Sequence, residues 1–183
     1  MFLMLSRCIA AACALVFVLG PTAVTAKGVE TAGTAVAIAM PIVASGVAFG
    51  HDEDWTGIAQ LSVDTVATVG TAYGLSHIVR EPRPDLSDNH SFPSDTAALA
   101  FAPAAFLWDR YGWEWGVPAY AAAAFVGWSR VDANKHHWYD VLASAGIAWG
   151  YSEIFTTRYH RRGFSSNIYA TPDGAFVHVS YNF

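Results

Sequence analysis

Five apolar blocks, separated by short polar stretches, limit what this chain can fold into. Alanine and glycine are abundant in them, and small residues let helices approach one another closely. We expect each block to form a helix. The pattern therefore predicts an all-α bundle of five to six helices. The blocks cover approximately residues 34–50, 56–75, 96–108, 117–128 and 140–156.

The first 26 residues have the pattern of an export signal. Arg7 supplies the positive region, Cys8 to Gly20 the apolar core, and residues 24–26 a small-residue cleavage site. An uncleaved signal anchor fits the same residues, because an apolar stretch of this length does not separate the two. In either case residue 27 emerges outside the cytoplasm. Both cysteines lie within this segment, so the body has neither disulfides nor thiolate metal sites.

The composition favours a membrane protein. Apolar residues make up 54% of the chain and charged residues 14%, which is unusual for a soluble domain. Tryptophans cluster at block ends, as in an aromatic belt, and arginines follow the last block, as at a cytoplasmic end. The net charge of -5 provides no basic patch, so we expect no nucleic-acid partner. The cluster consists of Trp55, Trp108, Trp113, Trp115, Trp128 and Trp138.

Two features favour a soluble bundle instead. The third and fourth blocks are short for a hydrocarbon core of about 30 Å. The loop at residues 51–54 is acidic where a cytoplasmic loop would be basic. We predict an inner-membrane protein with its site facing the periplasm, and a soluble periplasmic bundle is the alternative.

The chain divides into a signal segment (1–26), a helical domain (27–163) and a tail (164–183). The tail changes character, and its alternating residues around a Pro-Asp-Gly turn predict a β-hairpin packed against the bundle. Alternate threading of the five blocks places residues 76–95 and 129–140 on the same side. These polar segments carry the candidate chemistry and are predicted to meet there.

Residues 129–140 contain Ser129-Arg130, then His136, then Asp140. Arginine offers a planar fork of donors that matches phosphate oxygens. If the window ends by starting a helix, His136 and Asp140 share one face of it. A carboxylate there can hold an imidazole in one tautomer, as a nucleophilic histidine requires. The window indicates phosphoryl transfer.

Residues 80–96 supply the complementary groups. Arg83 precedes Pro84 in a rigid, extended backbone. Ser94 has the properties of an N-cap for a helix that begins around Asp95, and free N–H groups at a helix start favour an anion.

Together these residues resemble the type 2 phosphatidic acid phosphatase family, which shares its fold with vanadium haloperoxidases. That family has three motifs: Lys-x6-Arg-Pro, Pro-Ser-Gly-His and Ser-Arg-x5-His-x3-Asp. The third motif is complete here. The first is half present as Arg83-Pro84, and the second keeps only Pro93-Ser94. The resemblance covers about residues 30–157.

The resemblance implies hydrolysis of a phosphomonoester or diphosphate, most often of a lipid, without a metal or other cofactor. Arg83, Ser94 and Arg130 would bind the phosphate oxygens. His136 would attack phosphorus and form a phosphohistidine, with Asp140 orienting it. An arginine clamp can stabilise the charge on the equatorial oxygens of the transition state.

Two departures from the family pattern bear on catalysis. Ser76 occupies the lysine position, and we expect Arg80 to supply the missing positive charge. Asp95-Thr96 replaces the Gly-His pair, whose histidine protonates the leaving group. Threonine is too weak an acid for that step, and losing a general acid costs about 10²–10⁴-fold. The Asp95 side chain adds negative charge beside the phosphate or points away from it. In either case the backbone N–H of Asp95 stays available to the phosphate.

Three interpretations follow from the missing acid. His90 substitutes for it, the substrate is a diphosphate whose leaving group needs little protonation, or the site binds an anion such as a lipid phosphate and hydrolyses it slowly or not at all. A vanadate-dependent haloperoxidase is a further alternative, although the missing lysine argues against it. A structural role for Arg130 beside Asp132 or Asp140 also remains open.

A metal site is the remaining alternative for these side chains. Imidazole and carboxylate groups at His90, His136, His137 and Asp140 suit several metals. We do not expect one, because the family-like spacing already assigns His136 and Asp140.

Overall fold

The computed structural model describes residues 26–159, 163–171 and 174–182, with side chains for residues 27–159 alone. The predicted export signal lies outside the described residues except for its last residue. Each of the five apolar blocks corresponds to one helix, so the all-α prediction is confirmed. The helices are α2 (Ala26–His51), α3 (Thr56–Val79), α4 (Asp95–Tyr111), α5 (Trp113–Asp132) and α6 (Trp138–Phe155).

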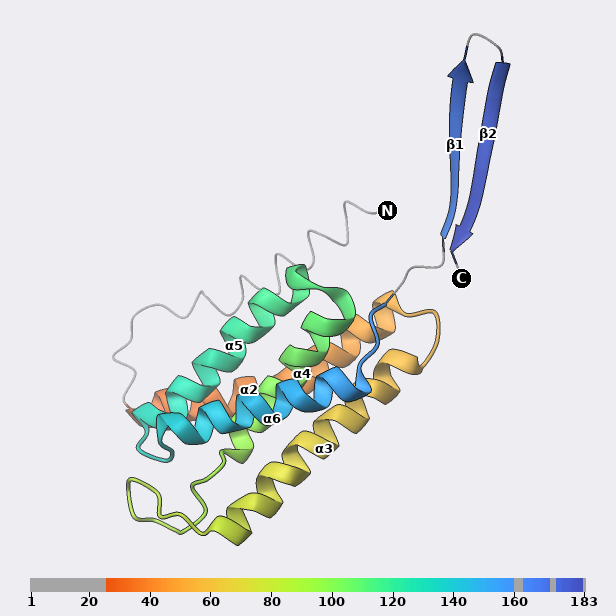
Figure 1. Ribbon diagram of the computed structural model, residues 1–183. Coiled ribbons are helices and arrows are strands. Elements are labelled where there is room, and N and C mark those ends of the chain that lie inside the picture. The colour runs from red at the N-terminus through yellow and green to blue at the C-terminus, as the bar shows by residue number, and fades with distance from the viewer. Residues whose placement is uncertain (1–25, 160–162, 172–173, 183) are drawn as a thin grey trace.

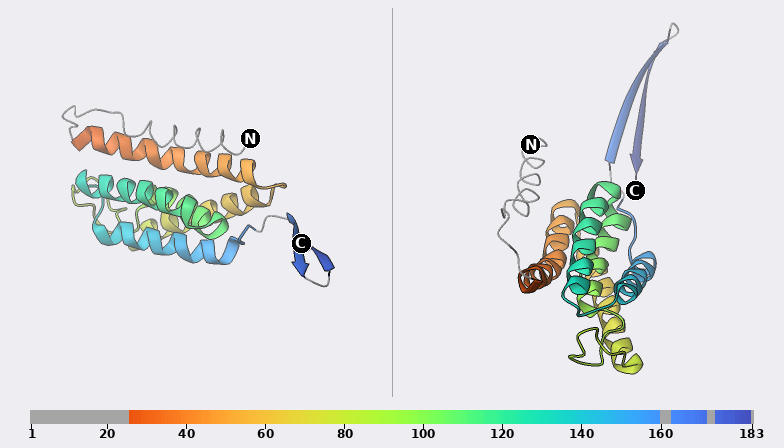
Figure 2. Two further views of the ribbon diagram at one scale, coloured as in Figure 1. Left: turned by 90° about the horizontal axis from the view of Figure 1, so that it is seen from above. Right: turned by 90° about the vertical axis from the view of Figure 1, so that its left-hand side faces the viewer.

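Helix α4 forms the centre of the bundle and packs against each of the other four helices. Every residue from Ala97 to Leu107 except Leu99 is buried. Six of the buried residues are alanines, and their small side chains allow neighbouring helices to approach closely. Helices α2 and α6 lie on opposite sides of the bundle (Figure 2). A helix that is apolar on all sides is stable only when it is enclosed in this way.

Helices α2 and α5 touch at a glycine. A Cβ atom built on Gly33 would lie 1.8 Å from Oγ of Ser129, so no larger residue fits without movement of α5. This close approach also brings Glu30 of α2 to Arg130 of α5. The start of α2 therefore reaches the end of the bundle where α5 finishes.

The loop between α3 and α4 meets the turn between α5 and α6 at one end of the bundle (Figure 1). Nζ of Lys135 lies 2.6 Å from the Asp85 carboxylate, and the Asp85 amide donates to the Asn134 carbonyl at 3.1 Å. The pKa of Asp85 is lowered, chiefly by the hydrogen bond from Lys135. The prediction that the two polar segments meet on one side is confirmed.

Large apolar side chains cover much of the outer surface. Phe49 of α2, Val66 and Ile78 of α3 and Leu142 of α6 are each at least two-thirds exposed. Lys27–His51 is long and apolar enough to cross a membrane, and it is the one such helix within the described residues. Apolar surface of this extent marks a membrane or protein contact.

The tail contains β1 (Gly163–Thr171) and β2 (Gly174–Asn182). Their backbones pair antiparallel, with Thr171 opposite Gly174 and Gly163 opposite Asn182. The side chains of the tail lie outside the described residues. The hairpin packed against the bundle therefore stays a prediction.

Candidate active site

His136 lies in the turn before α6 and is 2% exposed. Its Nδ1 atom is 2.8 Å from the carbonyl oxygen of Ser91. Because a carbonyl can only accept a hydrogen bond, Nδ1 must carry the ring proton when the imidazole is neutral. The lone pair is then on Nε2, which is the atom that can act as a nucleophile.

Asp140 is fully buried but does not hold His136 directly. Its Oδ2 atom lies 3.6 Å from Nδ1 of His136, which is too long for a hydrogen bond. That oxygen instead accepts from Oγ of Ser91 at 2.5 Å and from the amide of His137 at 2.8 Å. The orienting contact expected from Asp140 therefore comes from the Ser91 carbonyl, and Asp140 acts through Ser91.

Ser91 is the site residue that the sequence analysis missed. It is fully buried, its amide donates to the Glu81 carbonyl at 3.0 Å, and its carbonyl and hydroxyl contact His136 and Asp140. The partner side chains are 45 and 49 residues away along the chain. No local pattern signals such contacts, although Ser91 stands just before the Pro93-Ser94 pair.

Arg83 brings its positive charge to Nε2 of His136. Its Nη1 atom lies 3.1 Å from Nε2 of His136, and its Nε donates to Oδ1 of Asp88 at 2.7 Å. The hydrogen bond from Arg83 lowers the pKa of Asp88. Since guanidinium can only donate, Arg83 donates to the Nε2 lone pair of His136, and a phosphate that accepted this donor would free the lone pair.

The environment of His136 lowers its pKa. Burial has the largest effect, and the charge of Arg83 acts in the same direction. The hydrogen bond to Ser91 and the charges of Asp95 and Asp140 oppose the shift but do not cancel it. The imidazole is therefore neutral near pH 7, as attack on phosphorus requires.

The N-terminus of α4 also lies at the site. Ser94 is fully buried and is the N-cap, because its Oγ accepts from the Ala97 amide at 3.3 Å. This confirms the predicted cap and the predicted start of the helix at Asp95. A helix N-terminus carries partial positive charge and free N–H groups, which favour an anion.

Asp95 folds back over its own helix start. Its Oδ1 accepts from the Thr96 amide at 2.7 Å, which is one of the N–H groups that an anion would use. Its charge also acts on His136 and on Arg130, so it lies within electrostatic range of both. The carboxylate therefore adds negative charge at the site.

Arg130 is 6% exposed and is held by helix α2. Its Nη2 donates to the Glu30 carbonyl, and its Nη1 lies 4.0 Å from the Glu30 carboxylate. The charges of Asp95 and Arg83 also act on it. The structural partner of Arg130 is therefore Glu30 and not Asp132 or Asp140, the two candidates that the sequence offered. Arg130 remains within electrostatic range of the anion site.

A model of the PAP2 superfamily matches residues 57–164, which is more than half of the chain. The chain belongs to the PAP2 superfamily. Lipid A 4'-phosphatase of Helicobacter pylori strain J99 is 34% identical over 117 residues, which are 58% of this chain and 59% of that protein. The chain thus spans about three-fifths of the length of this curated relative.

Two solved PAP2 structures have the same fold. Aquifex aeolicus LpxE aligns with a TM-score of 0.52 and 20% identity over 66% of this chain and 83% of that chain. A transmembrane PAP2-type phosphatidylglycerolphosphate phosphatase from Bacillus subtilis aligns with a TM-score of 0.52 and 21% identity. That match covers 82% of this chain and 84% of the other.

The position of the missing PAP2 lysine is closed off within the bundle. Ser76 is 5% exposed, and its hydroxyl donates to the Tyr73 carbonyl at 2.8 Å. Arg80 ends α3 in a left-handed backbone conformation, and its Nε donates to the His77 carbonyl at 3.3 Å. That contact holds Arg80 at the end of its own helix, and its expected role in charge replacement stays a prediction.

His90, the expected substitute acid, is linked to Arg83 through the carboxylate of Asp88. Its Nδ1 atom is 3.8 Å from Asp88 Oδ1, the same oxygen that Arg83 binds. Its ring packs against His77 with the centroids 4.4 Å apart. The side chain is 41% exposed. Its assignment as general acid stays a prediction.

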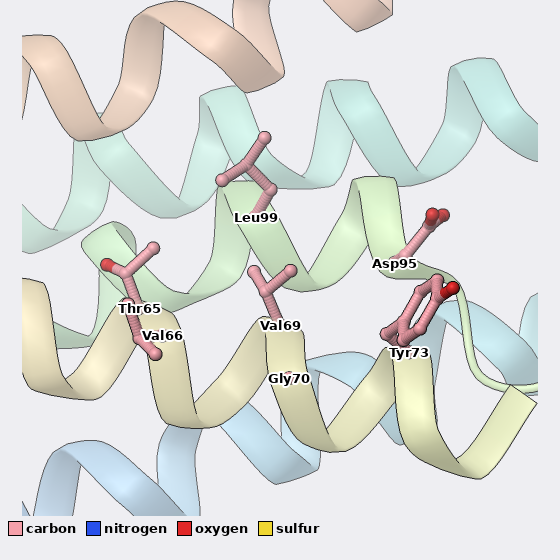
Figure 3. A pocket seen from close by; sticks show the side chains of 7 residues that line it. All are labelled: Thr65, Val66, Val69, Gly70, Tyr73, Asp95 and Leu99. Carbon is pink, nitrogen blue, oxygen red and sulfur yellow. The ribbon is translucent and has the colours of Figure 1, made fainter.

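An apolar cavity of about 500 Å³ opens between α3 and α4 beside Asp95 (Figure 3). Leu99 and Asp95 contribute to it from α4, and Tyr73 lies next to Asp95 at the same end. The cavity therefore runs from the start of α4 along the side of the bundle. The lining residues are Thr65, Val66, Val69, Gly70, Tyr73, Asp95 and Leu99.

Proposed function

We propose that this protein hydrolyses a phosphomonoester or diphosphate of a lipid through a phosphohistidine on His136. One observation carries the proposal: His136 donates through Nδ1 to Ser91 and presents Nε2 to Arg83 at 3.1 Å. This arrangement fixes the nucleophilic atom and places it beside an oxyanion ligand.

In the first step Nε2 of His136 attacks phosphorus, and the bond from phosphorus to the ester oxygen breaks. Arg83 and the N–H groups at the start of α4 stabilise the equatorial oxygens, with Arg130 adding positive charge. Water then attacks phosphorus, the P–N bond breaks, and its electron pair returns to Nε2. The proton of the water passes to the group that protonated the leaving oxygen or, for a diphosphate, to solvent. Because arginine and amide donors stabilise the negative charge on the phosphoryl oxygens, neither step requires a metal.

The leaving oxygen needs a proton or must be stable without one. His90 is the proposed donor, since it is partly exposed and linked through Asp88 to Arg83. A diphosphate substrate removes the requirement, because its leaving group is a weak base. Replacement of His90 by Gln would slow the monoester reaction far more than the diphosphate reaction if both statements hold.

Three observations support a lipid substrate. The apolar cavity begins at Asp95, which acts electrostatically on His136. Large apolar side chains cover the outside of the bundle. The relatives named above include a lipid A phosphatase and a transmembrane phosphatidylglycerolphosphate phosphatase. We infer that the bundle lies in a membrane, that the site faces the periplasm, and that an acyl chain occupies the cavity.

Gly70 offers a direct test of the cavity. A Cβ atom built there meets no atom within 4 Å, so Gly70→Leu adds volume to the cavity lining without a clash. Gly146→Leu on α6 is a matched control, since that glycine also faces open space. We expect Gly70→Leu to lower kcat/KM for long-chain substrates and to spare a water-soluble phosphoester. Equal effects of the two variants on long-chain substrates would exclude this cavity as the acyl site.

The central experiment is to trap the phosphoenzyme. Purified protein is mixed with ³²P-labelled lipid monophosphates, lipid diphosphates and a soluble ester, and is quenched at alkaline pH, where phosphohistidine survives. We expect label in the wild type and in the control His77→Ala, and none in His136→Ala. Turnover without an acid-labile phosphoenzyme, or equal turnover by His136→Ala, would overturn the mechanism.

A second candidate is a lipid-phosphate-binding protein with slow turnover, which the Asp95-Thr96 pair at the start of α4 favours. The double variant Asp95→Gly, Thr96→His restores the family pattern at these positions. A large rise in turnover would indicate that the natural chain is a weakened enzyme. Lipid-phosphate binding by the wild type without turnover by either protein would favour a binding function.

A further inference from the structure

Three potential metal ligands, one of them Asp140, lie close together next to His136. Glu81, His137 and Asp140 each offer one ligand atom, and these atoms lie within 4.8 Å of one another. Nδ1 of His137 is 3.4 Å from the Asp140 carboxylate and 3.9 Å from the Glu81 carboxylate. The cluster joins the segment after α3 to the first turn of α6.

Two of the three side chains have buried polar atoms without a partner. Asp140 is fully buried, and its Oδ1 atom makes no hydrogen bond. Nδ1 of His137 is also buried without a hydrogen-bond partner. Buried polar groups are normally paired, and leaving one unpaired is destabilising. The other oxygen of Asp140, Oδ2, is the one that accepts from Ser91 and His137, so Oδ1 is free to bind a ligand.

Neighbouring contacts hold the cluster in position. The ring of Tyr139 stacks on the ring of His137 with centroids 4.8 Å apart and an angle of 8°. The hydroxyl of Tyr139 donates to the Glu81 carboxylate. Hydrogen bonds to ligating carboxylates and fixed imidazole rings are the usual supports of a metal site.

We propose that Glu81, His137 and Asp140 bind a divalent cation of the zinc class. One imidazole nitrogen and two carboxylate oxygens suit Zn²⁺, and a fourth position remains for water. Ligands about 2.1 Å from a tetrahedral ion lie about 3.4 Å apart. Nδ1 of His137 lies 3.4 Å from Oδ2 of Asp140, which matches this value, and 3.9 Å from Oε1 of Glu81, which must move closer. Side-chain exposure of 34% at His137 and 27% at Glu81 gives the cation a path from solvent.

This ligand set differs from the one that the sequence suggested. His136 is unsuitable, because its Nδ1 is bonded to Ser91 and its Nε2 faces the cation Arg83. His90 packs against His77 instead. No sequence pattern indicates Glu81 as a ligand, because its approach to His137 depends on the path of the loop after α3.

Binding of the cation opposes catalysis. Asp140 supports His136 through Ser91, and a cation on the same carboxylate withdraws negative charge from that contact. The cation thus slows the attack of His136 on phosphorus. The inhibition rests on the proposed function, whereas the binding does not.

Zn²⁺ binding to the full chain is measured in detergent by equilibrium dialysis after treatment with EDTA. We expect one tight equivalent in the wild type and in His77→Ala, a control histidine at the same end. Glu81→Gln, His137→Ala and the milder His137→Gln should each weaken binding at least ~10-fold. Co²⁺ should give a d–d spectrum without thiolate charge-transfer bands, which excludes Cys8 and Cys13 as the ligands. Equal binding by all four proteins and His77→Ala, or no tight equivalent, would overturn the site.

Hydrolysis is measured in parallel with EDTA and with Zn²⁺. The wild type should lose most of its turnover with Zn²⁺, and Glu81→Gln should keep its EDTA-treated rate. Binding without a change in turnover would overturn the inhibition and leave the site intact. If no protein hydrolyses any substrate, the proposed function fails, and dialysis still decides the metal site.

Discussion

Each end of the bundle holds an arginine beside an aspartate, but the two arginines are bonded differently. At the end far from His136, Arg110 donates to Asp52 at 2.6 Å, and its other contacts are with Gln60 and Thr157. The second oxygen of Asp52 accepts from Tyr111 at 2.9 Å. The side chains of Arg110 and Asp52 are at most 5% exposed, so this ion pair is closed to solvent.

At the site end the arginine is only partly bonded within the protein. Arg83 is 17% exposed, and one of its donors points at the lone pair of a histidine. Atoms of His137 and Asp140 near that histidine have no partner. The difference shows that a buried ion pair with all its contacts made stabilises a fold, whereas incompletely bonded groups of the same kind can receive a ligand.

The largest effect should come from breaking the closed network. Arg110→Ala leaves the Asp52 carboxylate buried and unpaired, which costs about 3–5 kcal/mol. We expect a large drop in thermal stability in detergent with little change in turnover per folded molecule. Lys135→Ala at the more exposed pair with Asp85 is the control and should cost less than about 1 kcal/mol. Similar losses in the two variants would contradict the comparison.

The reverse result is expected at the site end. Arg83→Ala removes the donor beside Nε2 of His136 and should lower kcat/KM about 10²–10³-fold, the usual loss for one oxyanion ligand. Stability should change little, since this arginine is only partly bonded. Arg83→Lys keeps the charge without the planar fork and should restore part of the activity. Unfolding of Arg83→Ala at a much lower temperature would assign this arginine a structural role.

Ser91→Ala tests whether Asp140 acts through the serine. Loss of the hydroxyl that Asp140 binds should lower kcat/KM about tenfold, since a hydrogen bond to a charged group contributes about 1.5–3 kcal/mol. Asp140→Asn should weaken the same contact. The double variant should therefore be little worse than Asp140→Asn alone in a double-mutant cycle. Additive losses would show that the two residues act independently.

The smallest effect concerns pH. Because the proposed nucleophile is neutral His136 with a lowered pKa, kcat/KM should fall only as the pH drops below about 6.5. The negative charge of Asp95 raises this pKa, so Asp95→Asn should move the acidic limb to lower pH by less than about one unit. A shift to higher pH, or none, would contradict the role given to Asp95.

The same group contributes to the pH dependence of folding. Folded His136 has the lower pKa, so the unfolded chain binds more protons in the acidic range. Stability should therefore fall as the pH drops below the ordinary histidine pKa of about 6.5. His136→Gln should reduce this dependence.

Much of the fold could be predicted from local sequence. Apolar blocks of helical length gave five helices, and Ser94 before Asp95 identified the start of α4. These features depend on residues close together in the chain. The meeting of the two polar segments followed from counting helices, because alternate threading fixes which loops share an end.

The details of the site could not be predicted in this way. The shared face of His136 and Asp140 depended on a helix that includes both residues, but α6 begins at Trp138 with His137 as its N-cap. The spacing to Asp140 then no longer stacks the two side chains. The contacts of Ser91 and the network of Asp52 and Arg110 join residues about 45–60 positions apart, and their geometry depends on tertiary packing.

The central position of α4 has a consequence for synthesis. Its enclosing partners α5 and α6 follow it in the chain, so α4 leaves the ribosome before half of its surroundings exist. His136 and Asp140 arrive later still. The nascent chain therefore gains its enclosed core and its complete site together, when the last helix docks, and a product truncated before α6 has neither.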